Sequence, residues 1–392
     1  MIDEIIFFIL APLCTRDYKR FGVEILLNNG FKVRFLNISP YINPKLFQKS
    51  DKNQTFKSIT KKNLYSKLET KREIEKISKN SFIVMMVPCY NYEIYHVFRY
   101  ISKKNIPYAL PILSSVPVQI KVLDKLKKLR FDSLIGAILN RIFSPLNGKF
   151  MGVLPPNVVL LGGRISLSHQ LLLLSNKKTK KLWVHSFDYD VYLRDKDNKN
   201  ETDDEIITFI DAPSPRFKFD SLIKGISSPL TESVYYPALC HFFEILEREY
   251  KGRVSIASHP KSEHVYRPSY FDYRQTYKEA TITMIRKSKV IVNRNSTSVN
   301  FAILYNKPVI FHTSDEIENS LDQTMSSQIK SMASALNKTP VNINNLKNIN
   351  WIKELSIDNS SFNKYKDLYI KKEGSRNVYI WQEFSNWIRG EF

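Results

Sequence analysis

The stretch KVIVNRNSTSVNFAILYNKPVIF, residues 289–311, decides the fold class. Its apolar residues 290–292 predict a strand, residues 299–305 predict a helix, and residues 309–311 predict a second strand. Two strands joined through a helix pair in parallel, because the helix carries the chain back to the starting edge of the sheet. The stretch therefore predicts an α/β fold.

The same alternation runs along the whole chain. The N-terminal half opens with a predicted strand at 5–11, a helix at 17–29 that Gly30 ends, and a strand at 31–37. Further strands are predicted at 82–87, 106–110, 158–161, 182–185, 206–210 and 254–257, and further helices at 92–104, 118–143, 237–250, 277–287, 316–337 and 379–392. Residues 44–80 are polar and rich in lysine, which favours a loop with one solvated helix.

A charged, turn-rich break at residues 194–205 (RDKDNKNETDDE) divides the chain. We expect an N-terminal Rossmann-like domain over residues 1–195 and a second α/β domain over residues 205–375. The aromatic-rich end, residues 376–392, is expected to form a helix that packs back on the first domain. A length of 392 residues fits this division, since domains typically have roughly 100–200 residues.

The composition excludes several classes of protein. Hydrophobic residues make up 43% of the chain and aromatic residues 12%, enough for a packed core, so global disorder is excluded. The cysteines Cys14, Cys89 and Cys240 form no CxxC pair, which argues against a structural zinc site and favours a reducing, cytoplasmic compartment. The apolar residues 5–13 follow two acidic residues, which favours a buried first strand over a signal peptide. No apolar stretch reaches the ~18 residues of a membrane-spanning helix.

The charge balance points to an anionic partner. The chain has 59 Lys and Arg against 38 Asp and Glu, a formal net charge of +21. Such a charge attracts nucleic acid, an anionic membrane or a phosphorylated substrate. The lysines are dispersed over many predicted loops without a nucleic-acid-binding motif, so a basic nucleic-acid-binding protein is the alternative and no nucleic acid is expected as partner.

A histidine motif follows one predicted strand of the second half. His259, Pro260 and Lys261 come after strand 254–257, where the proline ends the strand and leaves the histidine at the edge of the sheet. A histidine in this place can donate to a phosphate or act as a general acid. A solvated loop histidine beside a turn proline is the structural alternative.

A hydroxyl-rich loop precedes the predicted helix 299–305. It contains Asn295, Ser296, Thr297 and Ser298. Hydroxyl groups together with the free N–H groups of a helix start form an anion site. An ordinary helix cap by Ser296 or Ser298 is the alternative, and the two roles are compatible.

Acidic residues and glycines follow other predicted strands. Asp211 ends strand 206–210, where it can serve as a general base or stabilise a turn before Pro213. Gly162 and Gly163 follow strand 158–161 and allow a ligand to approach the backbone, although no GxGxxG or P-loop pattern is present. Asp188 follows strand 182–185, where it can line the acceptor side of a cleft or complete a structural turn.

The order and spacing of these pieces resemble bacterial GT-B glycosyltransferases of surface-polysaccharide synthesis. The pieces are SIASHP at 255–260, STSVNFA at 296–302 and NKPVI at 306–310. The combination looks most like transferases that use CMP-activated sugars, such as bacterial sialyltransferases and Kdo transferases. The resemblance covers about residues 205–312, while the first half supports only the fold.

This resemblance implies two facing Rossmann-like domains with a cleft between them, the acceptor on the first and the nucleotide-sugar on the second. In the family, the HisPro histidine and the Ser/Thr pair contact the phosphate of the donor, which assigns this role to His259, Ser296 and Thr297. The family's motif of two acids and a glycine is missing around Asp211, so Asp188 or Asp190 is a rival for the base. A CMP donor carries its own leaving group, so no metal or other cofactor is expected.

The expected acceptor is a glycan or a lipid-linked glycan. A nucleotide-sugar epimerase and a CDP-polyol phosphotransferase on the same fold are the enzymatic alternatives. Residues 117–143 combine six basic residues with apolar residues at helical spacing, a pattern typical of helices that lie on anionic bilayers, although a core-packed helix with a solvated face is the alternative. We therefore expect a peripheral protein on the inner face of the cell membrane.

Overall fold

The computed structural model describes residues 1–49, 56–113, 116–117, 151–198, 203–215, 228–259, 270–347 and 349–392. The chain divides into two compact units. Of the described residues, unit 1 holds 1–113, 151–190 and Lys371–Phe392, and unit 2 holds 116–117 and those within Val191–Ile370. The chain passes from unit 1 to unit 2 within helix α9 (Phe187–Asp195) and returns after Ile370, whereas the sequence favoured 195–205 and 375 for these boundaries.

Unit 1 is built on a parallel sheet of seven strands in the order β3-β2-β1-β4-β5-β6-β7. The strands are β1 (Glu4–Ile9), β2 (Lys32–Asn37), β3 (Thr60–Asn63), β4 (Ser81–Met86), β5 (Tyr108–Ile112), β6 (Val158–Leu161) and β7 (Lys180–Trp183). The helices of this unit include α1 (Thr15–Arg20), α2 (Val23–Asn28), α3 (Ser39–Ile42), α4 (Pro44–Lys49), α5 (Lys67–Glu75), α6 (Tyr95–Lys104) and α18 (Ile380–Glu391).

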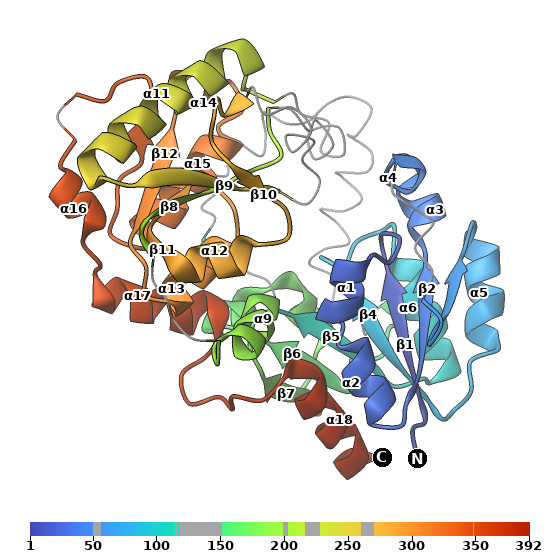
Figure 1. Ribbon diagram of the computed structural model, residues 1–392. Helices are drawn as coiled ribbons and strands as arrows, with labels where there is room; N and C mark the ends of the chain where they lie inside the picture. The colour runs from blue at the N-terminus through green and yellow to red at the C-terminus, as the bar shows by residue number, and fades with distance from the viewer. Residues whose placement is uncertain are drawn as a thin grey trace. The chain divides into compact units, whose positions relative to one another are not determined.

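Helices cover both faces of the unit 1 sheet (Figure 1). On one face, Ile6 and Phe8 of β1 share a buried cluster with residues of α5 and α6. On the other face, Phe7 packs with residues of α2 and α18. Because successive residues of a strand point to opposite faces, a strand buried on both sides forms a nearly continuous apolar run, as β1 does from Ile5 and β4 from Phe82.

The first helical segment is two helices, not the single helix predicted at 17–29. Helices α1 and α2 are separated at Gly22, which has a φ of 54°. A Cβ atom on Gly22 would lie 2.2 Å from Cδ1 of Trp381 in α18. The close approach of Trp381 therefore requires a glycine and ends the first helix.

Unit 2 is built on a second parallel sheet, in the order β10-β9-β8-β11-β12-β13. The strands are β8 (Asp203–Ile210), β9 (Arg253–Ala257), β10 (Thr276–Tyr277), β11 (Ser288–Asn293), β12 (Val309–Thr313) and β13 (Val341–Asn342). The helices include α11 (Glu232–Tyr250), α12 (Thr281–Lys287), α13 (Val299–Leu304), α14 (Asp315–Glu318), α15 (Thr324–Ser334), α16 (Trp351–Leu355) and α17 (Asn359–Tyr365).

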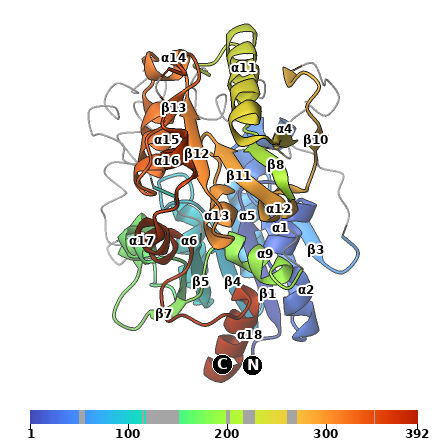
Figure 2. The ribbon, with the colours of Figure 1, turned by 60° about the vertical axis from the view of Figure 1, so that its left-hand side comes forward.

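The core of unit 2 lies between its sheet and the long helix α11 (Figure 2). Val290 and Val292 of β11 face this core together with Phe242 of α11 and Ile329 of α15. Two predicted helices differ from the structure. The segment 316–337 forms α14 and α15 with a turn between them, and the segment 277–287 begins with the short strand β10 before α12.

Candidate functional site

The carboxyl edge of the unit 2 sheet collects the motifs predicted in the second half. Strands β9, β8, β11 and β12 are neighbours and run in parallel, so the residues that follow them meet at one edge. In open α/β sheets, ligands bind at this edge. The residues found there are Asp211 after β8, Ser258 and His259 after β9, Arg294 after β11 and Ser314 after β12.

Asp211 links the ends of β8 and β9. The residue is only 4% exposed. Its carboxylate accepts two hydrogen bonds from backbone N–H groups: Oδ1 accepts from Ala212 (2.9 Å) and Oδ2 accepts from His259 (3.3 Å). Backbone donors hold an ionised carboxylate firmly in place. This geometry is the one expected for the turn-stabilising alternative, and the role of Asp211 as a base stays a prediction.

His259 is half-buried, and the bond from its backbone to Asp211 fixes the point at which the chain leaves β9. Pro260 and Lys261, which complete the motif, lie outside the described residues. The phosphate-binding role of these three residues stays a prediction.

The loop between β11 and α13 is held together by its own side chains. Asn293 donates from Nδ2 to the carbonyl of Ser296 (3.3 Å) and accepts from the N–H of Ser296 with Oδ1 (3.1 Å). Ser296 Oγ accepts from the N–H of Ser298 (3.3 Å), and Asn295 donates to Gln328 (3.4 Å). Thr297 is exposed. The hydrogen bonds of Asn293 and Ser296 stay within the loop, whereas Asn295 ties it to Gln328 of α15, and the role of the loop toward a donor phosphate stays a prediction.

Arg294 is a buried cation at this edge that was not predicted from the sequence. The residue is 1% exposed. Its Nη2 donates to the carbonyl of Ser214 (2.9 Å), its Nε donates to Asn295 Oδ1 (3.3 Å), and its Cζ lies 5.4 Å from the ring centroid of Tyr235. The Nη1 group is buried without an acceptor, and no carboxylate in the described part of the chain forms an ion pair with the guanidinium.

A buried guanidinium without a counter-charge is costly, commonly by several kcal/mol. An anion beside Nη1 would supply both the missing acceptor and the missing negative charge. The hydroxyls of Ser258 and Ser314, at the ends of β9 and β12, are likewise buried without a hydrogen-bond partner. The edge therefore presents several donors that the described protein groups do not satisfy.

Tyr235 of α11 and His312 of β12 form a neutral pair beside Arg294. Tyr235 Oη and His312 Nε2 are 3.0 Å apart and buried. Burial, with a smaller contribution from the charge of Arg294, lowers the pKa of His312 to about 3, so the imidazole is neutral near pH 7. Burial also raises the pKa of the Tyr235 hydroxyl. The pair thus adds no charge that would neutralise the guanidinium.

Gly162 and Gly163 lie at the carboxyl edge of the other sheet, in unit 1. A Cβ atom on Gly162 would lie 3.5 Å from the backbone nitrogen of Ser186, which is an ordinary contact. Gly163 has extended backbone angles and begins the 3₁₀ helix Arg164–Ser168. Their role in ligand binding therefore rests on their place at the strand end, not on a conformation that only glycine adopts.

The two candidate acids of unit 1, Asp188 and Asp190, lie in the first turn of α9. Asp188 is largely buried and pairs with Arg20 (Oδ1 to Nη2, 3.4 Å). Asp190 accepts a hydrogen bond from the backbone N–H of Ile380 (3.1 Å), which ties it to the start of α18. Asp190 thus stabilises the start of α18. The role of either acid as the base stays a prediction.

Among the described residues, no group of three or more His, Cys, Asp or Glu side chains could hold a metal ion. Among the helices of the same residues, none is both long and apolar enough to span a membrane. The basic segment 117–143 lies outside the described residues from position 118 onward, so the predicted membrane helix stays a prediction.

The sequence matches no protein-family model and no curated protein. Solved structures match along nearly the whole chain. The wall teichoic acid polymerase TagF, in a structure soaked with CDPG, is 10% identical with a TM-score of 0.53, and the match covers 99% of this chain and 88% of that chain. MurG from Acinetobacter baumannii is 9% identical (TM-score 0.48, 99% of both chains), and MnaA from S. aureus with UDP is 12% identical (0.48, 99% and 95%).

Similarity at this level of identity concerns the fold alone. The similarity to TagF agrees with the two parallel sheets, each covered by helices. The chain has the GT-B fold, with two Rossmann-like units, and the predicted fold class is confirmed.

Proposed function

We propose that this chain is a glycosyltransferase that takes a nucleotide-activated sugar as its donor. The observation that carries the proposal is the buried guanidinium of Arg294, whose Nη1 has no acceptor, at the carboxyl edge of the unit 2 sheet. A phosphate oxygen there would accept a charge-assisted hydrogen bond and balance the charge. The GT-B fold supports the nucleotide-linked part of this donor, since TagF, which shares the fold, was soaked with CDPG, and a CDP-polyol phosphotransferase is the second candidate.

In the proposed reaction, the bond between the anomeric carbon and the donor phosphate breaks, and a bond to an acceptor oxygen forms. Arg294 and His259, together with the loop that carries Ser296, stabilise the negative charge that develops on the leaving phosphate. A carboxylate, Asp211 first and Asp188 second, takes the proton of the acceptor hydroxyl. The preorganised donors cost no rearrangement at the moment of reaction, which is why such sites accelerate group transfer.

The finer assignment is part of the same proposal. The resemblance of the sequence to sialyl- and Kdo-transferases favours a CMP-activated sugar as donor. It also favours a glycan or lipid-linked acceptor of surface-polysaccharide synthesis, reached at the inner face of the cell membrane.

A thermal-shift screen with CMP, CDP, UDP and GDP tests the donor site. A nucleotide at a concentration of 100 times its Kd stabilises the folded state by about 2.7 kcal/mol. For a unit of this size, that corresponds to roughly 5–10 °C in Tm. Arg294→Met should abolish the shift, while Arg253→Met, at an exposed arginine of the same unit, should keep it. We expect Arg294→Met without nucleotide to be as stable as the parent, because a buried unpaired charge is removed.

The proposal fails if none of the four nucleotides shifts the parent protein, or if Arg294→Met responds like Arg253→Met. Product analysis with the stabilising nucleotide-sugar then separates the related activities. A transferase turns the donor over only with an acceptor, whereas an epimerase converts it alone and a phosphotransferase leaves a phosphodiester in the product.

A further inference from the structure

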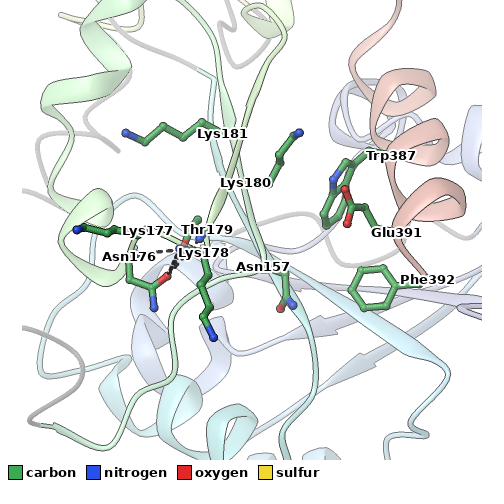
Figure 3. A pocket seen from close by; sticks show the side chains of 10 residues that line it. All are labelled: Asn157, Asn176, Lys177, Lys178, Thr179, Lys180, Lys181, Trp387, Glu391 and Phe392. Carbon is green, nitrogen blue, oxygen red and sulfur yellow. Dashed lines mark hydrogen bonds between the residues drawn. The ribbon is translucent and has the colours of Figure 1, made fainter.

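A pocket of about 570 Å³ lies at the amino end of the unit 1 sheet (Figure 3). Asn157 directly precedes β6, the turn 176–179 directly precedes β7, and Trp387 and Phe392 come from the end of α18. Its volume falls in the range of roughly 300–1,000 Å³ typical of small-ligand sites. Since the donor site is proposed at the carboxyl edge of the other sheet, this pocket is a separate feature.

The pocket is strongly basic. Four exposed lysines line it, and none has a partner among the described residues; they are Lys177, Lys178, Lys180 and Lys181. One carboxylate side chain, that of Glu391, also lines it. Lysines on β7, the last strand of the sheet, can protect this edge against aggregation. This role does not explain Lys177 and Lys178, which lie in the turn before β7.

Hydrogen bonds hold the backbone of the turn before β7, so the positions from which its lysine side chains start are fixed. Asn176 Oδ1 accepts from the N–H groups of Lys178 (2.8 Å) and Thr179 (3.2 Å), and Thr179 Oγ1 accepts from the N–H of Asn176 (3.1 Å). Figure 3 marks hydrogen bonds of this turn beside Asn176. The backbone of a turn held in this way loses little conformational entropy when a ligand binds.

The remaining wall offers further donors and an aromatic face. Asn157 Oδ1 accepts from the N–H of Tyr108 (3.1 Å), which leaves its Nδ2 group as a donor. Trp387 Nε1 is buried and has no acceptor. Phe392 is 43% exposed, and its ring packs edge-on against Trp387 at 5.9 Å. The aromatic rings are thus held in one wall of a concave site.

We propose that this pocket binds an acidic saccharide. Carboxylate or phosphate groups of the saccharide would pair with the lysines, and its oxygens would accept from Nδ2 of Asn157. The exposed face of Phe392 would pack against the apolar face of a sugar ring. A nucleic acid would need a basic stripe that follows several phosphates, and a membrane would need protruding apolar side chains, whereas this site is a bounded hollow.

If the proposed function holds, the consequence is an accessory site that keeps an acidic glycan acceptor attached away from its reacting end. Binding at a second point raises the local concentration of the acceptor without any new contact at the reacting groups. This consequence rests on the proposed function, but the binding of the saccharide does not.

Calorimetric titration of the full chain with tetragalacturonate, and with the neutral maltotetraose, tests the proposal. We expect tetragalacturonate to bind and maltotetraose to bind at least about tenfold more weakly. The variant Lys178→Glu/Lys180→Glu should lose at least about tenfold in affinity for tetragalacturonate. The matched variant Lys364→Glu/Lys366→Glu, at two exposed lysines of unit 2, makes the same change in net charge and should lose less than about twofold.

Three results would overturn the proposal: no binding of tetragalacturonate, equal losses in the two variants, or equal binding of the neutral saccharide. Co-sedimentation with phosphatidylglycerol vesicles gives a fourth, since loss of vesicle binding in Lys178→Glu/Lys180→Glu without loss of saccharide binding would identify a membrane site instead. The thermal shift by nucleotides should persist in this variant, so a failure here is distinguishable from a failure of the donor site.

Discussion

Gly22→Ala tests the contact that joins the first helices of unit 1 to α18. Gly22 has a φ of 54°, and an added Cβ would lie 2.2 Å from Cδ1 and 2.7 Å from Cβ of Trp381. An alanine in this left-handed region costs about 1–2 kcal/mol. Displacing the Trp381 ring costs roughly 1–3 kcal/mol more, as overpacking of a core does. The ring is 0% exposed, packs edge-on against Phe7 at 5.1 Å, and donates from Nε1 to the carbonyl of Arg20 at 2.7 Å.

We therefore expect Gly22→Ala to lower the free energy of unfolding of unit 1 by about 2–5 kcal/mol, measured by urea unfolding followed by near-ultraviolet circular dichroism. Gly374→Ala is the matched control, because Gly374 belongs to the same unit and has a φ of 76°, but an added Cβ meets no atom within 4 Å. It should show only the backbone cost of about 1–2 kcal/mol.

A double-mutant cycle with Trp381→Ala isolates the overlap. Trp381→Ala removes the ring atoms beside the added methyl group but keeps the Cβ atom at 2.7 Å, so Gly22→Ala should cost less there than in the parent, although more than the backbone cost of about 1–2 kcal/mol. Equal losses in Gly22→Ala and Gly374→Ala, or an undiminished loss in the Trp381→Ala background, would refute the reasoning. Either result would mean that Trp381 does not occupy the space beside Gly22.

Three further predictions concern buried charges and hydrogen bonds. Asp211→Asn keeps one acceptor and places an amide against a backbone donor, so urea unfolding should show a loss of about 1–3 kcal/mol. If Asp211 is also the base, turnover should fall by at least about 100-fold, and normal turnover would remove it from the catalytic set. Asp195→Ala should cost unit 2 about 3–5 kcal/mol in urea unfolding, since it removes the carboxylate that pairs with the buried Arg286 (Nε to Oδ2, 2.9 Å), whereas Glu205→Ala at an exposed pair should cost less than about 1 kcal/mol. Burial lowers the pKa of His96 to about 4, so the unfolded state binds a proton that the folded state does not as the pH falls from about 6.5 to about 4. Stability should drop in that window by up to about 1.4 kcal/mol per pH unit, and His96→Gln should flatten the slope in unfolding curves measured across it.

The strands could be predicted where burial on both faces makes the local sequence apolar. A parallel strand covered on both faces is a nearly continuous apolar run. The strands predicted from such runs at 5–11, 82–87 and 158–161 correspond to β1, β4 and β6. Strand β3 has no such apolar pattern. Its sequence, TKKN, is polar and mostly exposed at the edge of the sheet, so its pairing with β2 depends on a neighbour that the segment itself does not reveal.

The break between α1 and α2 could not be predicted for a related reason. The local periodicity of residues 17–29 is compatible with one continuous helix, and Gly22 alone costs such a helix only about 1 kcal/mol. The conformation at Gly22 is decided by Trp381, which lies near the other end of the chain. Contacts between distant segments leave no trace in a local pattern, and they account for this difference between expectation and structure.

The candidate site likewise combines residues that a local sequence pattern reveals with one residue that it does not reveal. Asp211, His259 and the loop that carries Ser296 share one edge of the unit 2 sheet because they follow parallel strands, which a local pattern reveals. Arg294 was not chosen, since an arginine in a polar loop is usually solvated, and its burial depends on Tyr235 and on the loop that holds Ser214. The signal that could have found it is its position directly after the apolar strand β11, one residue beyond Asn293.

The burial of Arg20 and Arg294 indicates which unit is the more favourable place for the phosphate of the proposed donor. The net charge of +21 is spread over many exposed side chains, whose attraction for an anion is weak and screened by salt. In unit 1, the partly exposed Arg20 already has a carboxylate partner, Asp188, at 3.4 Å. In unit 2, Arg294 is more deeply buried and has no ion pair in the described part of the chain, so a phosphate gains more there than beside Arg20.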